Sequence, residues 1–363
     1  MREEVLRAMW QVYSEAFGNA SSIHHYGQSA RQLFENARRQ VASLIRATAE
    51  EIVFTSGGTE SNNLAIFGLM PDQPGHFLTS AIEHPAVLEC TRELRRLGHE
   101  VTLLPVGAEG IVDPSDVARA IRPGTWGVSL MAVNNEIGSL QPVREVALLC
   151  REHGVPLHCD AVQAPGRLAV DVGDWGVDLL SLSAHKFYGP KGVGALYVRK
   201  GVALRKRSFG GRHERDRRPG TENVAGAVGM GAAAALVETM SPALRDWFEG
   251  EVLARVPDVF VNGSRERRAP NVSNLRFPGI EGEAMVIGLD LKGLAVSSGA
   301  ACSSGAVEPS HVLLALGLSA ADARSSLRIS FGAGNTRDEA ERLVEALGEV
   351  VGRLRKLSTA YAK

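Results

Sequence analysis

The chain has 363 residues, which is enough for two domains of roughly 100–200 residues, each with its own core. Its composition (44% hydrophobic, 22% charged) is typical of a soluble globular protein, and a formal net charge of −1 gives no overall field that would attract nucleic acid or an acidic membrane. No apolar run reaches the roughly 20 residues of a membrane span, and the N-terminus carries charges of both signs without an apolar signal core.

The cysteines are few and far apart, and no two of them form a Cys-x-x-Cys pair. They are Cys90, Cys150, Cys159 and Cys302. This spacing is typical of a reducing compartment and argues against a disulfide framework or a zinc site. We therefore expect a cytoplasmic protein with a small-molecule substrate and no resident metal.

Short β-rich segments alternate with helices over residues 51–199, after a first predicted helix at residues 3–13. The predicted strands are residues 51–56, 76–82, 101–106, 126–133, 155–159, 178–183 and 194–199. The predicted helices between them are residues 59–69, 85–97, 114–121 and 143–153. This alternation predicts an α/β domain with a mostly parallel, seven-stranded sheet flanked by helices.

The pattern changes after residue 225. A helix rich in Ala and Gly is predicted at residues 226–238, and a mixed α+β region follows. Its predicted strands are residues 272–277 and 327–330, and its predicted helices are residues 283–289 and 336–357. We expect an N-terminal helix (1–14) that packs with the small domain, a large domain (15–240) and a small C-terminal domain (241–363).

Lys186 ends an apolar strand in the run Ser183-Ala-His-Lys, just before a Gly-Pro turn. A lysine at the end of a buried strand is costly unless it is paired or covalently modified. In an open α/β sheet this position faces the ligand crevice, where a desolvated lysine can form a Schiff base with an aldehyde cofactor. Taken by itself, Lys186 fits the first residue of a surface turn equally well.

Two other predicted strand ends carry suitable groups. Asp160 follows one strand and is a candidate to keep a pyridine nitrogen protonated, although a turn or helix-cap aspartate is common. Residues 55–61 form a strand, a glycine turn and a helix start, which presents backbone N–H groups to a phosphate. An anion cradle, a carboxylate and a lysine in this order favour a cofactor with a phosphate, a pyridine ring and an aldehyde.

Eight motifs are arranged in one order along nearly the whole chain. They are Thr55-Ser-Gly-Gly-Thr-Glu-Ser-Asn-Asn63, Glu83-His84, Asn134-Asn-Glu-Ile-Gly138, Asp160-Ala-Val-Gln163, Ser183-Ala-His-Lys186, Arg218-Pro-Gly-Thr-Glu-Asn223, Ser297-Ser-Gly-Ala-Ala-Cys-Ser-Ser-Gly305 and Arg328-Ile-Ser-Phe-Gly332. With these motifs the chain resembles the class V aminotransferases, and within them the cysteine desulfurases. The resemblance implies a fold-type I transferase dependent on pyridoxal 5′-phosphate, with L-cysteine as substrate.

The resemblance also implies roles for the cofactor-binding residues. Lys186 would carry the cofactor through a Schiff base and move protons on the substrate. Asp160 would pair with the pyridine nitrogen, and His84 would stack on the ring and assist proton transfer. Gln163 and Asn135 would hydrogen-bond the phenolic oxygen and steady the substrate. The residues implied to hold the phosphate are Gly58, Thr59, Ser183 and His185.

Two further roles concern the substrate and a second subunit. Arg328 would bind the substrate carboxylate, a task suited to its forked guanidinium. Thr221 would reach the phosphate of a neighbouring subunit, which implies a homodimer with shared active sites.

Cys302 lies in a run of small residues without the large apolar neighbours of a typical buried cysteine. By itself it fits a small surface cysteine. Beside a pyridoxal site, its thiolate would attack the substrate sulfur, keep it as a persulfide and release alanine, with basic groups such as His84 lowering the thiol pKa. The run resembles the longer loop of housekeeping and nitrogen-fixation type desulfurases. Those enzymes hand sulfur to iron–sulfur scaffold proteins or thiolation pathways, so Cys302 is also a candidate transient iron–sulfur ligand.

Two segments call for a separate interpretation. Family members open with a strand and a loop similar to Asp-Asn-Ala-Ala-Thr-Thr, whereas this chain opens at the helix of residues 3–13, and we expect a start site further upstream.

Residues 205–218 are basic and could touch RNA or an acidic protein, but we interpret them as the family's glycine-arginine loop that precedes Thr221, and expect no direct nucleic-acid binding.

Two other functions remain open at this point. One is a different pyridoxal enzyme of the same fold, such as a selenocysteine lyase or a small-substrate aminotransferase, which would not need Cys302. The other is a non-catalytic scaffold that has kept the fold. Formation of alanine and sulfide from cysteine would separate these possibilities.

Overall fold

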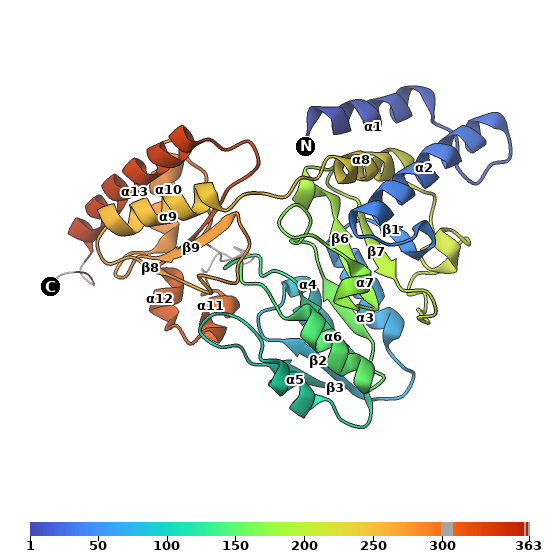
Figure 1. The fold of residues 1–363 in the computed structure, drawn as a ribbon, viewed down its shortest axis with the longest axis horizontal. Coiled ribbons are helices and arrows are strands. Elements are labelled where there is room, and N and C mark those ends of the chain that lie inside the picture. Colours follow the sequence, from blue (N-terminus) through green and yellow to red (C-terminus); the bar gives the residue numbers. More distant parts are fainter. Residues whose placement is uncertain (299–307, 359–360, 362–363) are drawn as a thin grey trace. The chain divides into compact units, whose positions relative to one another are not determined.

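The computed structural model describes residues 1–298, 308–358 and 361 (Figure 1). The chain forms two compact units. The first comprises Met1–Leu104, Pro114–Ala132 and Pro142–Thr239, and the second comprises Pro105–Asp113, Val133–Gln141 and Met240–Lys363. The expected boundary at residue 240 coincides with the start of the long segment of the second unit. The two short segments that also belong to that unit were not expected from the sequence.

The first unit is built on a seven-stranded sheet with the order β1-β7-β6-β5-β4-β2-β3. The strands are β1 (Ile52–Thr55), β2 (His76–Ser80), β3 (Glu100–Leu104), β4 (Thr125–Met131), β5 (Leu157–Asp160), β6 (Leu179–Ser183) and β7 (Gly194–Val198). Strand β7 runs antiparallel to both of its neighbours, while the pairs β6–β5, β5–β4, β4–β2 and β2–β3 are parallel. The predicted mostly parallel α/β sheet is therefore confirmed.

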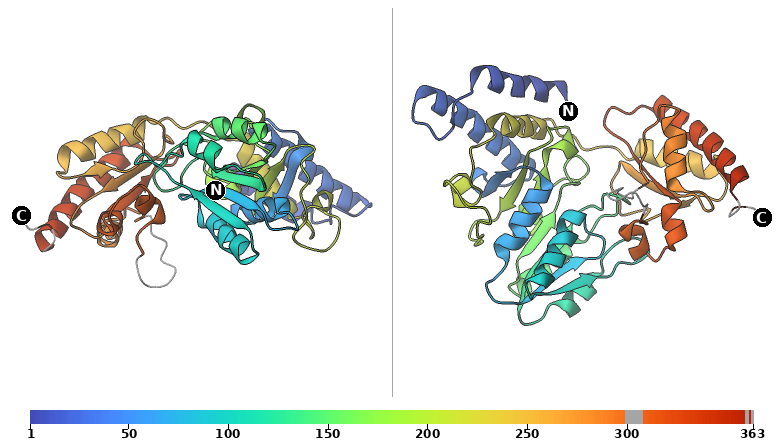
Figure 2. Two further views of the ribbon diagram at one scale, coloured as in Figure 1. Left: turned by 90° about the horizontal axis from the view of Figure 1, so that it is seen from below. Right: turned by 180° about the vertical axis from the view of Figure 1, so that it is seen from behind.

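Helices cover both faces of this sheet. Helix α3 (Gly58–Leu69) packs on α4 (Pro85–Arg96), and α6 (Val143–Glu152) packs on α5 (Pro114–Ala120) and α7 (Val172–Trp175). The two groups lie on opposite faces (Figures 1 and 2). Strands β1, β2, β5, β6 and β7 are buried along their whole length, as expected for strands of a sheet that is covered on both faces.

Helices α1 (Glu3–Glu15) and α2 (His25–Leu44) both pack on α8 (Val224–Ala235). We expected residues 1–14 to pack with the small domain; instead, α1 lies on the first unit. The small residues of α8 allow this close approach, because a Cβ atom at Gly229 would lie 2.6 Å from the Met9 sulfur and one at Gly231 would lie 2.7 Å from the Cα of Ala37. Arg2 adds a hydrogen bond of 2.8 Å from Nη1 to the Leu236 carbonyl.

The second unit has an antiparallel three-stranded sheet in the order β10-β9-β8. Its strands and helices are β8 (Phe260–Val261), β9 (Val272–Arg276), β10 (Ser326–Ser330), α9 (Ala243–Arg255), α10 (Gly282–Asp290), α11 (His311–Ala315), α12 (Ala320–Arg324) and α13 (Arg337–Leu357). Phe248 of α9, Phe277 and Leu347 of α13 are fully buried in its core. The predicted α+β character of this unit is confirmed. None of the helices in the described part of the chain combines the length and the apolarity that a membrane crossing requires.

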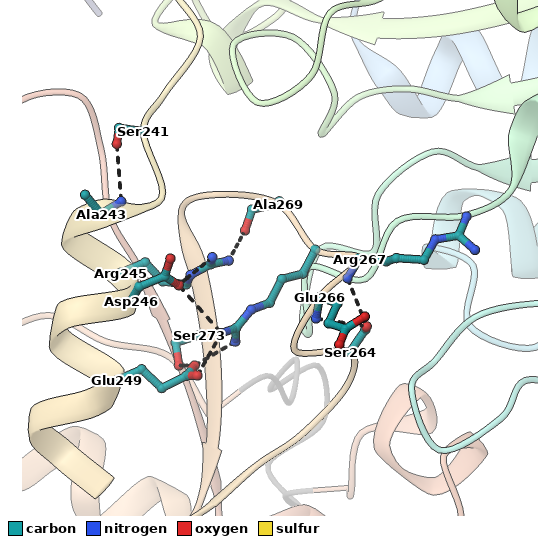
Figure 3. A network of polar contacts seen from close by, with 11 residues as sticks. Ser241, Ala243, Arg245, Asp246, Glu249, Ser264, Glu266, Arg267, Ala269 and Ser273 are labelled. Carbon is teal, nitrogen blue, oxygen red and sulfur yellow. Dashed lines mark hydrogen bonds and ion pairs between the residues drawn. The ribbon is translucent and has the colours of Figure 1, made fainter. Parts of the chain in front are cut away.

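A buried ionic network of the second unit lies beside the backbone that pairs with the short segment Val133–Gln141; Figure 3 shows the network. The carboxylate of Glu249 on α9 accepts two hydrogen bonds of 2.7 Å from Arg268 and one of 2.7 Å from the Ser273 hydroxyl. The backbone around Arg268 in turn pairs with the short segment, since the amide of Leu140 donates to Arg267 at 2.9 Å and that of Ala269 to Gly138 at 2.8 Å. Asn134, Asn135 and Glu136, which belong to one of the motifs, therefore have a fixed backbone.

Candidate active site

Several candidate residues follow the carboxyl ends of parallel strands in the first unit. Asp160 is the last residue of β5, and Ser183 is the last residue of β6. The next residues, Ala184–Phe187, form a short 3-10 helix that carries His185 and Lys186. Because β5 and β6 are parallel neighbours, the two strands end at the same edge of the sheet, where open α/β folds bind ligands.

The carboxyl group of Asp160 is buried among two hydrogen-bond donors and lies near two positively charged side chains. Its side chain is 5% exposed and accepts hydrogen bonds from Asn62 Nδ2 (2.7 Å) and from the Val162 amide (3.0 Å). Burial raises the pKa of Asp160, while these two hydrogen bonds and the positive charges of His84 and Lys186 act in the opposite direction. A cationic ring N–H would add the opposite charge that a buried carboxylate requires.

The turn between β1 and α3 forms an anion cradle. Gly57 has φ of +151°, a conformation that L-residues rarely adopt, and α3 begins at Gly58 with N–H groups that have no acceptor within the helix. The Ser183 hydroxyl lies 3.8 Å from the place a Cβ of Gly57 would occupy, and it bonds His185 Nδ1 at 3.0 Å. Partial burial and the charges of Lys186 and Lys191 lower the pKa of His185. The structure thus brings Gly58, Ser183 and His185 together, with Thr59 next along α3.

The donors and acceptors of this edge fit pyridoxal phosphate. The helix start and the Ser183 hydroxyl supply donors for a phosphate, and Asp160 supplies an acceptor for a pyridine N–H. Lys186 supplies the amine for an aldehyde, and its charge acts on Asp160. Gln163 closes the tight turn after Asp160, in which the Ala164 amide bonds the Ala161 carbonyl at 2.8 Å.

His84 caps the start of α4, since its Nδ1 accepts from the Ala86 amide at 3.0 Å. This contact fixes the ring, and the Pro at position 85 is tolerated in the first turn of the helix because an N–H there would have no acceptor within the helix. Thr221 is exposed in the segment before α8. This segment is tied to the start of α3 by Arg218, whose Nε donates to Glu60 at 2.8 Å.

Asn62 and Glu83 lie beside these residues and were not predicted as site residues. Asn62 is 1% exposed, and its Oδ1 has no hydrogen-bond partner among the described residues. Glu83 is fully buried and accepts from the Ser80 hydroxyl (2.6 Å) and the Met131 amide (2.9 Å). Both belong to the motifs quoted above, but only the folded chain shows that one contacts Asp160 and that the other is buried in its electrostatic neighbourhood.

The buried Glu83 predicts a pH effect on stability. Burial, reinforced by the charge of Asp160, raises the pKa of Glu83 from 4.5 to about 8 despite the two hydrogen bonds. The folded state therefore binds this proton more tightly than the unfolded chain, so its stabilising contribution is complete below about pH 4.5 and is lost as the pH rises towards about 8. Glu83→Gln is expected to remove this dependence, so that between pH 5 and 8 the wild type loses roughly 2–4 kcal/mol more stability than the variant.

Urea unfolding at pH 5, 6, 7 and 8 measures this difference. The exposed Glu145 of α6 offers a matched control, because Glu145→Gln makes the same chemical change at the surface. Parallel stability profiles for the wild type and Glu83→Gln would contradict the prediction.

Asn135 and Arg328 belong to the second unit. Arg328 Nη1 donates to the Asn135 carbonyl at 3.0 Å, while its buried Nε has no acceptor among the described residues. Arg328 therefore keeps donor capacity for a carboxylate. Cys302 lies outside the described residues.

The three other cysteines are buried, and their thiols are poor nucleophiles. Cys90, Cys150 and Cys159 are at most 3% exposed. Burial raises the pKa of Cys90 and of Cys150 to about 12, and that of Cys159 well above its ordinary value. Since only the thiolate reacts, these three side chains are structural. Within the described residues, no group of three or more His, Cys, Asp or Glu side chains is placed to hold a metal ion.

Comparisons with known proteins agree with this geometry. The family model "Aminotransferase class-V" matches residues 1–343. Cysteine desulfurase IscS of Dictyoglomus turgidum is 46% identical over 369 residues, which cover 99% of this chain and 93% of that protein. A solved NifS-like protein superposes with a TM-score of 0.90 at 32% identity, covering 98% of this chain and 97% of the other.

A second solved structure, SspA in complex with cysteine, has a TM-score of 0.83 at 37% identity over 91% of this chain and 95% of that one. The family match covers most of the chain, and the sequence relative is similar over nearly its whole length. The chain belongs to the class-V aminotransferase family.

Proposed function

We propose that this protein is a cysteine desulfurase that depends on pyridoxal phosphate, converts L-cysteine to L-alanine and retains the sulfur as a persulfide on Cys302. The observation that carries the proposal is the buried Asp160, which ends β5 within the electrostatic reach of Lys186 and His84. The relatives named as cysteine desulfurases support the same reaction.

The cofactor, when bound, supplies an electron-withdrawing ring that weakens the bonds at the substrate α-carbon and β-carbon. Asp160 holds the ring N–H, and the cradle of Gly58, Thr59, Ser183 and His185 holds the phosphate. Lys186 would hold the aldehyde through its side-chain amine, and the same amine, when free, would take the α-proton of the substrate. Gln163 and His84 orient the ring.

The remaining steps use residues outside this cradle. Arg328 binds the substrate carboxylate, and Asn135 steadies the substrate. The Cys302 thiolate attacks the substrate sulfur, the carbon–sulfur bond breaks, and a proton returned to carbon completes alanine. Cysteine and one protein thiol thus give alanine and one persulfide, so that no external oxidant or reductant is needed. The burial and high pKa of Cys90 and Cys150 leave Cys302 as the thiol for this step.

A direct assay tests the proposal. Purified protein with pyridoxal phosphate is incubated with L-cysteine; alanine and protein-bound persulfide should form in a one-to-one ratio in the first turnover, and sulfide should follow when a thiol reductant is added. Absence of alanine from protein that carries the cofactor would favour a non-catalytic scaffold. Formation of 3-mercaptopyruvate without persulfide would indicate an aminotransferase.

We further propose that the protein is a homodimer in which Thr221 of one subunit reaches the phosphate bound by the other. Large apolar side chains are exposed on α1, on the segment that follows it and at the start of α2. They are Trp10 (71% exposed), Tyr13 (64%), Phe17 (72%), Ile23 (92%) and Tyr26 (55%). Phe17 stacks on Tyr26 with ring centroids 5.3 Å apart, and burial of these exposed apolar side chains in a dimer would stabilise the assembly.

The dimer proposal predicts a linked change in assembly and cofactor affinity. The double variant Trp10→Asp/Phe17→Asp is expected to sediment as a monomer and to bind pyridoxal phosphate about 10-fold more weakly, because each site loses the hydroxyl of Thr221. Leu291→Asp, which changes an 83% exposed apolar residue of the second unit, is the control and should leave both properties unchanged. A double variant that remains a dimer with wild-type affinity would contradict the proposal.

The persulfide on Cys302 is expected to pass to a sulfur-acceptor protein, for iron–sulfur cluster assembly or thiolation. The name IscS of the relatives supports this assignment. Transfer is measured by incubating the persulfide form with a purified iron–sulfur scaffold and following labelled sulfur between the two proteins.

A further inference from the structure

Glu136 is a buried carboxyl group in the second unit to which the reaction above assigns no role. It lies in the segment Val133–Gln141 and is 5% exposed. Its Oε2 accepts a hydrogen bond of 2.5 Å from the hydroxyl of Ser310. A buried carboxyl group is costly and needs compensating partners, so the identity of its neighbours is informative.

The neighbours of Glu136 include two basic side chains. Burial raises the pKa of Glu136, while the Ser310 hydrogen bond and the positive charges of His311 and Arg328 act in the opposite direction. Arg328 also contacts the residue before Glu136, because its Nη1 donates to the Asn135 carbonyl at 3.0 Å. The carboxyl group of Glu136 thus lies in the field of the arginine that we assign to the substrate carboxylate.

The backbone of Glu136 is itself held firmly. Asn134 Oδ1 accepts hydrogen bonds from the amides of Glu136 (2.9 Å) and Ile137 (3.1 Å), and Asn274 Nδ2 of β9 donates to the Glu136 carbonyl at 3.1 Å. Ser310, in contrast, begins a short helix as the N-cap of α11. The carboxyl group of Glu136, whose backbone is fixed, therefore holds the hydroxyl of Ser310 at the start of helix α11.

Arg328 and Ser310 are also related through the chain. Arg328 pairs with Ser297, since the Arg328 amide donates to Ser297 at 2.6 Å and the Ser297 amide donates to Arg328 at 3.2 Å. Ser297 precedes Cys302 in the sequence and Ser310 follows it. Of the described residues on the two sides of Cys302, Ser297 is thus hydrogen-bonded to Arg328, and Ser310 is hydrogen-bonded to Glu136.

We propose that Glu136 is a positioning residue for substrate binding: its carboxyl group fixes Ser310 and anchors the backbone at Asn135 and Glu136, where the Asn135 carbonyl holds Arg328 in place to receive the carboxylate of the amino-acid substrate. This inference rests on the proposed function of Arg328. An arginine side chain loses considerable rotamer freedom when it binds, and a neighbouring acceptor group reduces that loss by holding it beforehand. Glu136 does not touch the reacting atoms.

The proposal predicts a particular kinetic pattern. A carboxylate contact is made in the ground state and in the transition state alike, so its loss raises KM and leaves kcat nearly unchanged. Glu136→Ala is expected to raise KM for L-cysteine about 10-fold with kcat within about 2-fold of the wild type. Glu136→Gln keeps an acceptor oxygen in the same place and should stay within about 3-fold of the wild-type KM.

Two serines provide a matched pair that does not depend on changing the buried carboxyl group. Ser310 and Ser319 are the N-caps of α11 and α12, and each accepts a hydrogen bond from a helix amide, Leu313 for the first and Asp322 for the second. Of the two, only Ser310 contacts Glu136. Ser310→Ala should raise KM about 5-fold, while Ser319→Ala, which loses an equivalent cap, should leave KM unchanged.

Hydrogen–deuterium exchange gives a readout that does not depend on turnover. In Glu136→Ala, amides of residues 308–316 should exchange at least about 10-fold faster, while those of β5 and β6 should be unchanged. If exchange in 308–316 and KM both match the wild type in Glu136→Ala, or if Ser310→Ala and Ser319→Ala raise KM equally, the inference is wrong.

The outcomes also separate this inference from the proposed function. If the wild-type protein forms no alanine from cysteine, the proposed function fails, while the exchange result still tests the tie between Glu136 and Ser310. If the wild type is active and Arg328→Met raises KM while Glu136→Ala does not, the proposed function stands and the positioning role fails. A Glu136→Ala variant that does not fold leaves the serine pair to decide.

Discussion

Lys186→Ala is expected to yield protein without covalently bound cofactor and with a turnover of cysteine at least about 10³-fold below that of the wild type. Two functions are lost together, the attachment of the aldehyde and the transfer of the α-proton, and proton transfer by a positioned group is by itself worth about 10²–10⁴-fold. Borohydride reduction followed by peptide mapping should label residue 186 in the wild type and no residue in the variant.

A nearby lysine is the control for this experiment. Lys191 is exposed in the turn that follows the 3-10 helix, so Lys191→Ala changes a charge in the same region without removing the amine at position 186. It should keep the reducible adduct and most of the activity. The assignment fails if Lys186→Ala still carries a reducible adduct at the active site, or if borohydride labels Lys191 in the wild type.

Cys302→Ala is expected to keep the cofactor absorbance and to lose the persulfide completely, with the rate of alanine formation at least about 10²-fold lower. The reason is that the substrate sulfur then has no thiolate to accept it, and nucleophilic attack is the step that breaks the carbon–sulfur bond. Persulfide is measured by alkylation and mass spectrometry after a single turnover with labelled cysteine. An enzyme that acts by transamination would be unaffected by this substitution.

The buried cysteines supply the controls for this prediction. Cys90→Ala and Cys150→Ala should lower the free energy of unfolding by about 1–2 kcal/mol through lost packing, yet keep persulfide formation at Cys302. Their thiols, with pKa values of about 12, are almost fully protonated at neutral pH. Persulfide on Cys90 or Cys150 in the wild-type protein would overturn the assignment of Cys302.

The two predictions with the largest expected effects rest on different evidence, the structure for Lys186 and mainly the sequence for Cys302. Lys186 lies in the 3-10 helix that follows β6, where its charge acts on the buried Asp160. Cys302 is assigned from its sequence motif and from the burial of the other three thiols. A result in which the first prediction holds and the second does not would describe a pyridoxal enzyme of this fold that uses another sulfur acceptor or performs another reaction.

The strand pattern was predictable because each strand of the large sheet is a local feature. Buried parallel strands are short segments rich in apolar residues, and the segments predicted at residues 76–82 and 178–183 correspond to β2 and β6 within two residues at each end. The order of candidate groups along the chain also predicts Asp160 and Lys186 at or after the ends of strands. Helix α2 was not predicted; its 20 residues are polar on average, and its partner α8 lies about 180 residues away in the sequence.

Contacts between distant segments were decided by the tertiary structure. Asn62 and Asp160 are 98 residues apart, and Glu136 and Ser310 are 174 residues apart, so no local pattern indicates that either pair meets. The packing of α1 and α2 on α8 depends on the absence of side chains at Gly229 and Gly231. The sequence contains these glycines but does not indicate which helices pack on them.

The sequence by itself determined the chemistry: which side chains are present, in which order, and on which strand ends they stand. The tertiary structure decided how those side chains are tuned, because pKa values and hydrogen bonds depend on burial and on groups brought together by the sheet. Glu83 illustrates the difference, since a glutamate in the sequence is an ordinary acid, and only its complete burial, reinforced by the charge of Asp160, raises its pKa to about 8.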